Sequence, residues 1–80
     1  MRDVVVYSRR GCHLCEELLE QLEPLCRGRA EIVVHDVDTR TEWAATYGDY
    51  IPVVCIDGQN ICHYTLDRPA VIKALGTVSD

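Results

Sequence analysis

The chain has 80 residues, of which 48% are hydrophobic and 26% charged, so it has room for one small domain and not for two. Thirteen acidic residues against eight basic ones give a net charge of −5, which argues against nucleic acid or an anionic membrane surface as a partner. No apolar run approaches the roughly 20 residues of a membrane span or the apolar segment of a secretory signal. We therefore expect a single domain over residues 1–80, mature as written and cytoplasmic.

The first half of the sequence predicts a strand, a helix and a second strand. Residues 3–7 are mostly β-branched and aromatic, and the turn-forming residues 8–11 follow them, so a buried strand should end there. Apolar residues spaced by three and four predict an amphipathic helix over residues 14–26. Pro24 lacks an amide hydrogen, so we expect a kink or an early helix end at that position. A second β-branched run over residues 31–35 predicts the next strand.

A short helix should follow the second strand. Asp36, Asp38 and Thr39 are of the residue types that cap helices, and they stand just before a segment with a helical composition. We therefore predict a helix over residues 41–47 that ends at Gly48.

The last third of the sequence predicts a hairpin and a final helix. Two β-branched segments, residues 53–56 and 61–64, flank an Asp57-Gly58 turn signal. Asp67 can cap a helix that runs to Leu75. The resulting order of strand, helix, strand, helix, hairpin and helix is an α/β order, in which the first two strands should be parallel and joined by a right-handed crossover.

The five cysteines direct attention to thiol chemistry. An odd count without an export signal argues against a disulfide framework, and clustered cysteines in a cytosolic domain more often serve metal binding or redox reactions. Cys12 and Cys15 lie where the first strand gives way to the first helix. Residues three apart on a helix have Cα atoms roughly 5 to 6 Å apart, a separation at which a disulfide closes with little strain.

The predicted position at the start of a helix gives the two cysteines different roles. Unpaired amides and the helix dipole favour an anion there, and Arg9 and Arg10 add positive charge, so we expect Cys12 to be the nucleophilic thiolate. Cys15, one turn deeper and shielded, suits a resolving thiol. His13 either stabilises the thiolate as an imidazolium or occupies an exposed site in the first turn without a role.

At this point the sequence resembles glutaredoxin-like proteins of the thioredoxin fold. The resemblance is carried by residues 7–15, by residues 50–54 and by the Asp57-Gly58 hairpin, and it extends over residues 3–76. It implies an α/β, thioredoxin-like fold with a four-stranded mixed sheet flanked by helices. It also implies that the Ile51-Pro52 bond is cis and packs against the dithiol, and that the Ile51 backbone pairs with an extended substrate.

The same resemblance implies a thiol–disulfide oxidoreductase that reduces protein or glutathione mixed disulfides, with Cys12 attacking and Cys15 resolving. The expected partners are disulfide-bearing proteins and a reductant, either glutathione or a donor of the thioredoxin-reductase type. We expect a monomer with no tightly bound cofactor, and glutathione as a possible co-substrate. The expected substrate-binding residues are Arg9, Arg10, His13, Ile51 and Pro52.

Two departures from typical glutaredoxins concern the predicted site. His13-Leu14 stands where those proteins have Pro-Tyr between the cysteines. Residues 64–67 stand where they have a Gly-Gly pair before an Asp that helps hold glutathione, and the bulkier side chains leave less backbone exposed to a tripeptide.

Other interpretations of the cysteines remain open from the sequence. Cys12 and Cys15 could ligate zinc or share an iron–sulfur cluster between two chains, or the domain could be a recognition module without catalysis. Cys26 and Cys55 are expected to pack in the core as small hydrophobes. Cys62 could pair with Cys55 across the hairpin or help bind metal, although the spacing fits no standard zinc pattern, and we assign no metal ligand. The remaining candidates, His35 and Trp43, are expected to be structural or surface residues.

Overall fold

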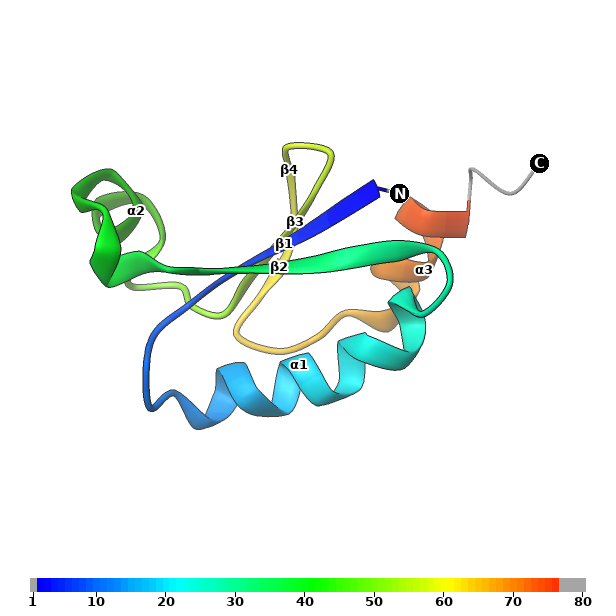
Figure 1. The fold of residues 1–80 in the computed structure, drawn as a ribbon, viewed down its shortest axis with the longest axis horizontal. Helices are drawn as coiled ribbons and strands as arrows, with labels where there is room; N and C mark the ends of the chain where they lie inside the picture. Colours follow the sequence, from blue (N-terminus) through cyan, green and yellow to red (C-terminus); the bar gives the residue numbers. More distant parts are fainter. Residues whose placement is uncertain (1, 77–80) are drawn as a thin grey trace.

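A four-stranded mixed sheet forms the centre of the molecule in this computed structural model, which describes residues 2–76 (Figure 1). The strands are β1 (Arg2–Ser8), β2 (Ala30–Asp36), β3 (Val53–Ile56) and β4 (Gln59–His63), in the spatial order β2-β1-β3-β4. β1 and β2 are parallel, whereas β3 is antiparallel to β1 and β4 is antiparallel to β3. The predicted α/β fold with a mixed four-stranded sheet is confirmed. The ends of the predicted domain, residue 1 and residues 77–80, lie outside the described residues.

The three helices are distributed unevenly around the sheet. α1 (His13–Cys26) and α3 (Arg68–Gly76) pack together on one face (Figure 1). α2 (Thr41–Tyr47) follows the short 3-10 turn η1 (Val37–Thr39) and lies at one end of the sheet. None of the helices within residues 2–76 is long and apolar enough to cross a membrane.

The core lies between the sheet and the α1/α3 layer. Alternate residues of β1 are buried because successive side chains of a strand point to opposite faces. Val4 and Val6 are fully buried and meet Leu18 and Leu22, which recur on one side of α1. The same cluster contains Cys26, Ala30, Val54, Ile56, Val71 and Leu75. This packing fixes α1 against the sheet and so sets where its first residue stands.

Of the kink or early end expected at Pro24, the early end is wrong. The helix includes Pro24 and ends two residues later, at Cys26, and Gly28 follows with a φ of +78°. A proline so close to the end of a helix removes one backbone hydrogen bond, while Leu22 and Cys26 on either side of it remain packed in the core. The tertiary contacts of the last turn therefore outweigh the local preference.

The capping residues before α2 serve a different element from the one predicted. α2 has the predicted bounds and ends at Gly48, but its N-cap Arg40 makes no side-chain capping bond. Asp36 instead accepts a hydrogen bond from the Asp38 amide at 2.9 Å, and Thr39 donates its hydroxyl to the Asp36 carbonyl at 2.6 Å. These bonds stabilise η1, because its exposed amide and carbonyl groups need partners as much as those of an α-helix do.

The hairpin turn and the cap of α3 have the predicted chemistry. Asp57 and Gly58 have φ values of 54° and 81°, the two positive values that a type I′ hairpin turn requires. β4 begins directly after this turn, at Gln59 rather than at residue 61. Asp67 accepts a hydrogen bond from the Ala70 amide at 3.1 Å, as an N-cap carboxylate does.

Candidate active site

The chain between β1 and α1 places Cys12 directly before the first turn of the helix. Gly11 takes a φ of +74°, which reverses the chain, and the Cys12 amide donates to the Arg9 carbonyl at 3.3 Å. Cys12 has an extended backbone and is the N-cap of α1. Its Sγ accepts a hydrogen bond from the Cys15 amide at 3.2 Å, so the sulfur occupies the position that a serine or aspartate oxygen takes at other helix starts.

The two sulfurs differ in burial, although only one helical turn separates them. Cys12 is partly exposed, whereas Cys15 is 2% exposed, and both thiols are free. Burial, together with hydrogen bonding to the Cys12 thiol, raises the pKa of Cys15 from 9.0 to about 11, while the Arg9 backbone and the Ser8 side chain act in the opposite direction. Near neutral pH the buried Cys15 thiol is therefore protonated, while the neighbouring Cys12 sulfur remains accessible to solvent.

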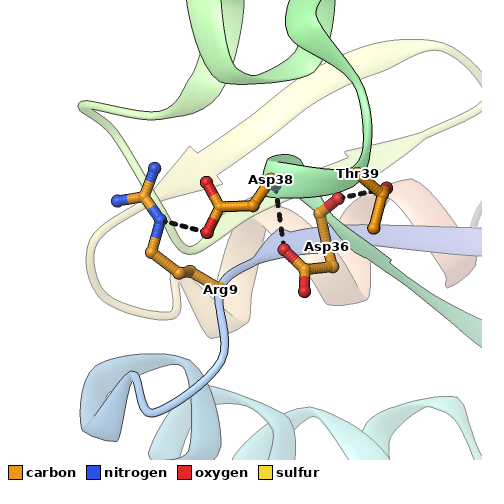
Figure 2. A network of polar contacts seen from close by, with 4 residues as sticks. All are labelled: Arg9, Asp36, Asp38 and Thr39. Atoms are coloured by element: carbon orange, nitrogen blue, oxygen red, sulfur yellow. Dashed lines mark hydrogen bonds and ion pairs between the residues drawn. The ribbon is translucent and has the colours of Figure 1, made fainter.

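The basic residues near Cys12 differ in whether an acidic side chain neutralises their charge. Arg9 Nε donates to Asp38 Oδ2 at 3.0 Å, and this ion pair joins the loop before α1 to the η1 turn (Figure 2). Asp38 raises the pKa of Arg9, so the guanidinium stays charged but shares its charge with a carboxylate. Arg10 is exposed and makes no ion pair within residues 2–76. His13 is 94% exposed, with Nδ1 at 3.7 Å from Glu16 Oε1.

Residues 48–52, which we call the proline loop, join α2 to β3 and lie beside β1, the strand that leads to the dithiol. The Ile51-Pro52 peptide bond is cis, as the resemblance implied. Tyr7 pairs with Val53 in the sheet, so the antiparallel register brings Pro52 level with Ser8, at the end of β1 from which the chain turns towards Cys12. Pro52 is buried, and its carbonyl accepts from the Tyr64 amide at 2.9 Å. The amide and carbonyl of Ile51 make no hydrogen bond to the rest of residues 2–76 and so remain available to a partner.

The remaining cysteines lie away from this site. Cys26 is 2% exposed in the core, and Cys55 is 6% exposed and donates its thiol hydrogen to Asn60 Oδ1 at 2.9 Å, so both pack as expected. Cys62 pairs with Val54, whereas Cys55 pairs with Asn60, so the two thiols belong to opposite faces of the hairpin and both are free. The disulfide considered between them is absent. Within residues 2–76, no group of three or more His, Cys, Asp or Glu side chains is gathered to hold a metal ion.

Two groups of aromatic rings flank the proline loop, and sequence reasoning assigned no role to most of their members. In the first, Tyr7 stacks on Tyr47 at 3.9 Å between ring centroids, and His35 stacks on Trp43 at 4.4 Å. These contacts anchor α2 to the sheet, in agreement with the expected structural role of His35 and Trp43. The second group comprises Tyr50, His63 and Tyr64. Its only signal in the sequence is that aromatic residues stand next to the proline loop and at the end of the hairpin.

Fold and site together define a thioredoxin-like protein with a dithiol at the start of its first helix. The chain belongs to the glutaredoxin-like family, because residues 3–76 match the family model described as glutaredoxin-like domain (DUF836). A search of curated protein sequences found no significant match.

Solved structures share the fold at low sequence identity. A structural genomics target protein from X. campestris, XcR50, is 24% identical with a TM-score of 0.74, and the match covers 94% of this chain and 97% of that one. A buckwheat glutaredoxin in complex with glutathione is 19% identical with a TM-score of 0.66, over 95% and 78% of the two chains. A malarial protein is 10% identical with a TM-score of 0.68, over 100% and 99%. At these identities the likeness establishes the thioredoxin-like fold and nothing finer.

Proposed function

We propose that this protein is a thiol–disulfide oxidoreductase in which Cys12 is the nucleophile and Cys15 the resolving thiol. The observation that supports the proposal best is the position of the Cys12 sulfur at the N-terminus of α1, where it is partly exposed and accepts the Cys15 amide. A helix N-terminus stabilises negative charge on a sulfur, and the thiolate is the reactive form of a cysteine.

The proposed reaction transfers two electrons from the dithiol to a substrate disulfide. The Cys12 thiolate attacks one sulfur of the substrate, so a mixed disulfide forms and the other substrate sulfur leaves as a thiolate. Cys15 then attacks the Cys12 sulfur, a Cys12–Cys15 disulfide forms, and the second substrate sulfur is released. The proton that Cys15 loses goes to a departing thiolate, and two equivalents of an external thiol later restore the dithiol.

The burial of Cys15 orders these two steps. Because its pKa is about 11, Cys15 keeps its proton near neutral pH and does not compete with Cys12 for the incoming disulfide. Once a substrate is bound to Cys12, the sulfur that Cys15 must attack is one helical turn away. The free backbone of Ile51 offers a place for the substrate chain to pair as an added strand, with Pro52 beside it.

The remaining elements of the proposal concern the partners. We propose protein or glutathione mixed disulfides as substrates, and glutathione or a donor of the thioredoxin-reductase type as reductant, with no tightly bound cofactor. Arg10 and His13 have exposed side chains with which to meet substrate, and Arg9 positions the loop through Asp38. We propose that the protein acts in the cytoplasm, where thiols are kept reduced, and as a monomer.

Trapping of the reaction intermediate tests this proposal. The Cys15→Ser variant is mixed with a protein or glutathione mixed disulfide. It should accumulate an adduct on Cys12 that intact-mass spectrometry detects, because no Cys15 thiol is present to attack the Cys12 sulfur and release the substrate. The Cys12→Ser variant should form no adduct on Cys15 and should catalyse no exchange. Full exchange activity in Cys12→Ser would refute the assignment.

A further inference from the structure

Exposed apolar side chains gather beside the dithiol. Among residues 2–76, five large hydrophobic residues are exposed, and three of these are Leu14, Tyr50 and Tyr64, at 49%, 50% and 45%. Leu14 stands between the two cysteines, and Tyr64 lines the same hollow as Leu14. The Tyr50 and Tyr64 rings are 6.4 Å apart, and His63 lies edge-on to both. We call Leu14, Tyr50, His63 and Tyr64 the apolar rim.

The backbone of Tyr64 adopts a conformation that disfavours a bulky residue. Its φ is +68°, in the left-handed region that glycine occupies freely and that costs other residues free energy. The ring is nevertheless held firmly, because it packs on His63 with 4.7 Å between centroids and its hydroxyl donates to the Asp49 carbonyl at 2.8 Å. These contacts offset the backbone strain and keep a tyrosine ring at the rim.

The charges around the rim are acidic. Glu17 lines the hollow that Leu14 and Tyr64 share, and Asp49 directly precedes Tyr50. Both side chains are exposed, and within the described part of the chain neither takes part in an ion pair. A substrate that lies across the rim therefore meets apolar surface between two carboxylates that form no ion pair, of which Asp49 lies near enough to Arg9 to help raise the pKa of that guanidinium.

We infer that the apolar rim binds an extended segment of a disulfide-bearing protein, with an aromatic or aliphatic side chain next to the reactive cysteine and a basic residue nearby. The inference rests on the proposed function and narrows its substrate class. The free backbone of Ile51 supplies strand pairing, which directs one side chain of the segment to Tyr50 and Tyr64. Glu17 and Asp49 then pair with the basic residue.

Glutathione is a poor match for the same surface. It carries two carboxylates, one ammonium group and no large apolar side chain, so it gains little from the rings, and Glu17 and Asp49 repel its net negative charge.

Kinetics with a matched set of peptides test the inference. Four octapeptides, each with one cysteine in a mixed disulfide with 2-mercaptoethanol, would combine Phe or Gly beside the cysteine with Arg or Glu two positions away. We expect kcat/KM to be about ten-fold higher for Phe than for Gly, the size of one favourable aromatic contact. We also expect it to be higher for Arg than for Glu, by a ratio that falls as salt is added.

Variants test whether the apolar rim and its acidic neighbours cause these two ratios. Tyr64→Gly, which suits the positive φ, should bring the Phe/Gly ratio close to one, whereas Tyr64→Phe should keep most of it. Glu17→Gln should reduce the Arg/Glu ratio. Ile72→Ala and Glu31→Gln provide matched controls, because they remove an exposed apolar and an exposed acidic side chain on α3 and at the start of β2. Both ratios should be unchanged in the controls.

The reaction of the unmodified protein with hydroxyethyl disulfide separates failure of this inference from failure of the proposed function. That disulfide is too small to reach across the rim. No exchange with it would contradict the proposed function itself. Exchange with it, together with a Phe/Gly ratio near one or a ratio that survives in Tyr64→Gly, would overturn the inference alone. Faster reaction with glutathione disulfide than with the Phe and Arg peptide would overturn it as well.

Discussion

The two ends of α1 each carry a cysteine, and the two sulfurs have opposite surroundings. Cys12 stands before the first turn, partly exposed, with the Cys15 amide directed at its sulfur. Cys26 is the last residue of the helix and is 2% exposed in the core. Burial raises the pKa of Cys26, and the charge of Glu23 raises it further.

This contrast shows that position, more than residue type, decides what a thiol can do here. The helix dipole favours an anion at the N-terminus and disfavours it at the C-terminus, and solvent reaches only the first of the two sulfurs. In the proposed function, one end of α1 thus serves chemistry, while the other end stabilises the fold. Cys15 lies near the N-terminus of α1, close to Cys12, but is buried like a core residue. A resolving thiol needs both this closeness and this shielding.

The largest expected effect is a loss in the free energy of unfolding when a residue in the packed part of α1 is truncated. Leu22 is fully buried against β1, so Leu22→Ala should lower the free energy of unfolding by about 3 kcal/mol through lost burial and the cavity left behind. His13→Ala, at the exposed end, should change it by less than about 0.5 kcal/mol. Urea denaturation followed by circular dichroism measures both. Equal losses in the two variants would contradict the division of α1 into a packed and an exposed end.

The buried cysteines should make stability depend on pH. Burial raises the pKa of Cys15 to about 11 and also raises that of Cys26, so the folded chain holds these protons more tightly than the unfolded chain does. The stabilisation is complete below pH 9 and is lost as the pH rises towards 11. We expect the free energy of unfolding, measured under reducing conditions, to fall across this interval. The fall should be smaller in Cys26→Ala, and an identical profile in that variant would argue against the assigned contribution of Cys26.

A smaller effect on the free energy of unfolding is expected from the N-cap of α3, which can be compared with the N-cap of α1. Asp67 caps α3 with a carboxylate, as Cys12 caps α1 with sulfur. Asp67→Ala should lower the free energy of unfolding by about 1 kcal/mol, and Asp67→Asn should recover most of that loss because an amide oxygen also accepts the Ala70 amide. Thermal unfolding of the two variants provides the measurement. A loss in Asp67→Asn as large as in Asp67→Ala would mean that the charge of Asp67, and not its capping bond, matters.

Much of the fold was predictable because local sequence and tertiary packing agree. Alternating and helical periodicities give the strands and helices to within a few residues, and Asp57-Gly58 specifies its turn through backbone conformation alone. The position of Cys12 at a helix start followed from the same reasoning, because it needs only a strand, a turn and a helix in succession. The cis bond before Pro52 came from the family resemblance and not from local physics.

The features that escaped prediction depend on contacts between distant segments. Pro24 stays within α1 because the core holds the last turn in place. The charge of Arg9 is shared with Asp38, 29 positions away in the sequence, so the sequence alone overstates the positive charge beside Cys12. The apolar rim joins α1, the proline loop and the end of β4, and no local pattern brings those three together.

The rate of alkylation of Cys12, measured in the folded and the unfolded chain, tests the central claim most directly. Iodoacetamide at pH 7, with peptide mass spectrometry, reports each cysteine separately. Unfolding in urea exposes every thiol, so exposure alone would make all of them react faster. We predict that Cys12 reacts at least about ten times faster in the folded chain than in urea, because only the folded helix stabilises its thiolate, while Cys26 shows the reverse. A folded Cys12 that reacts no faster than in urea would contradict the account.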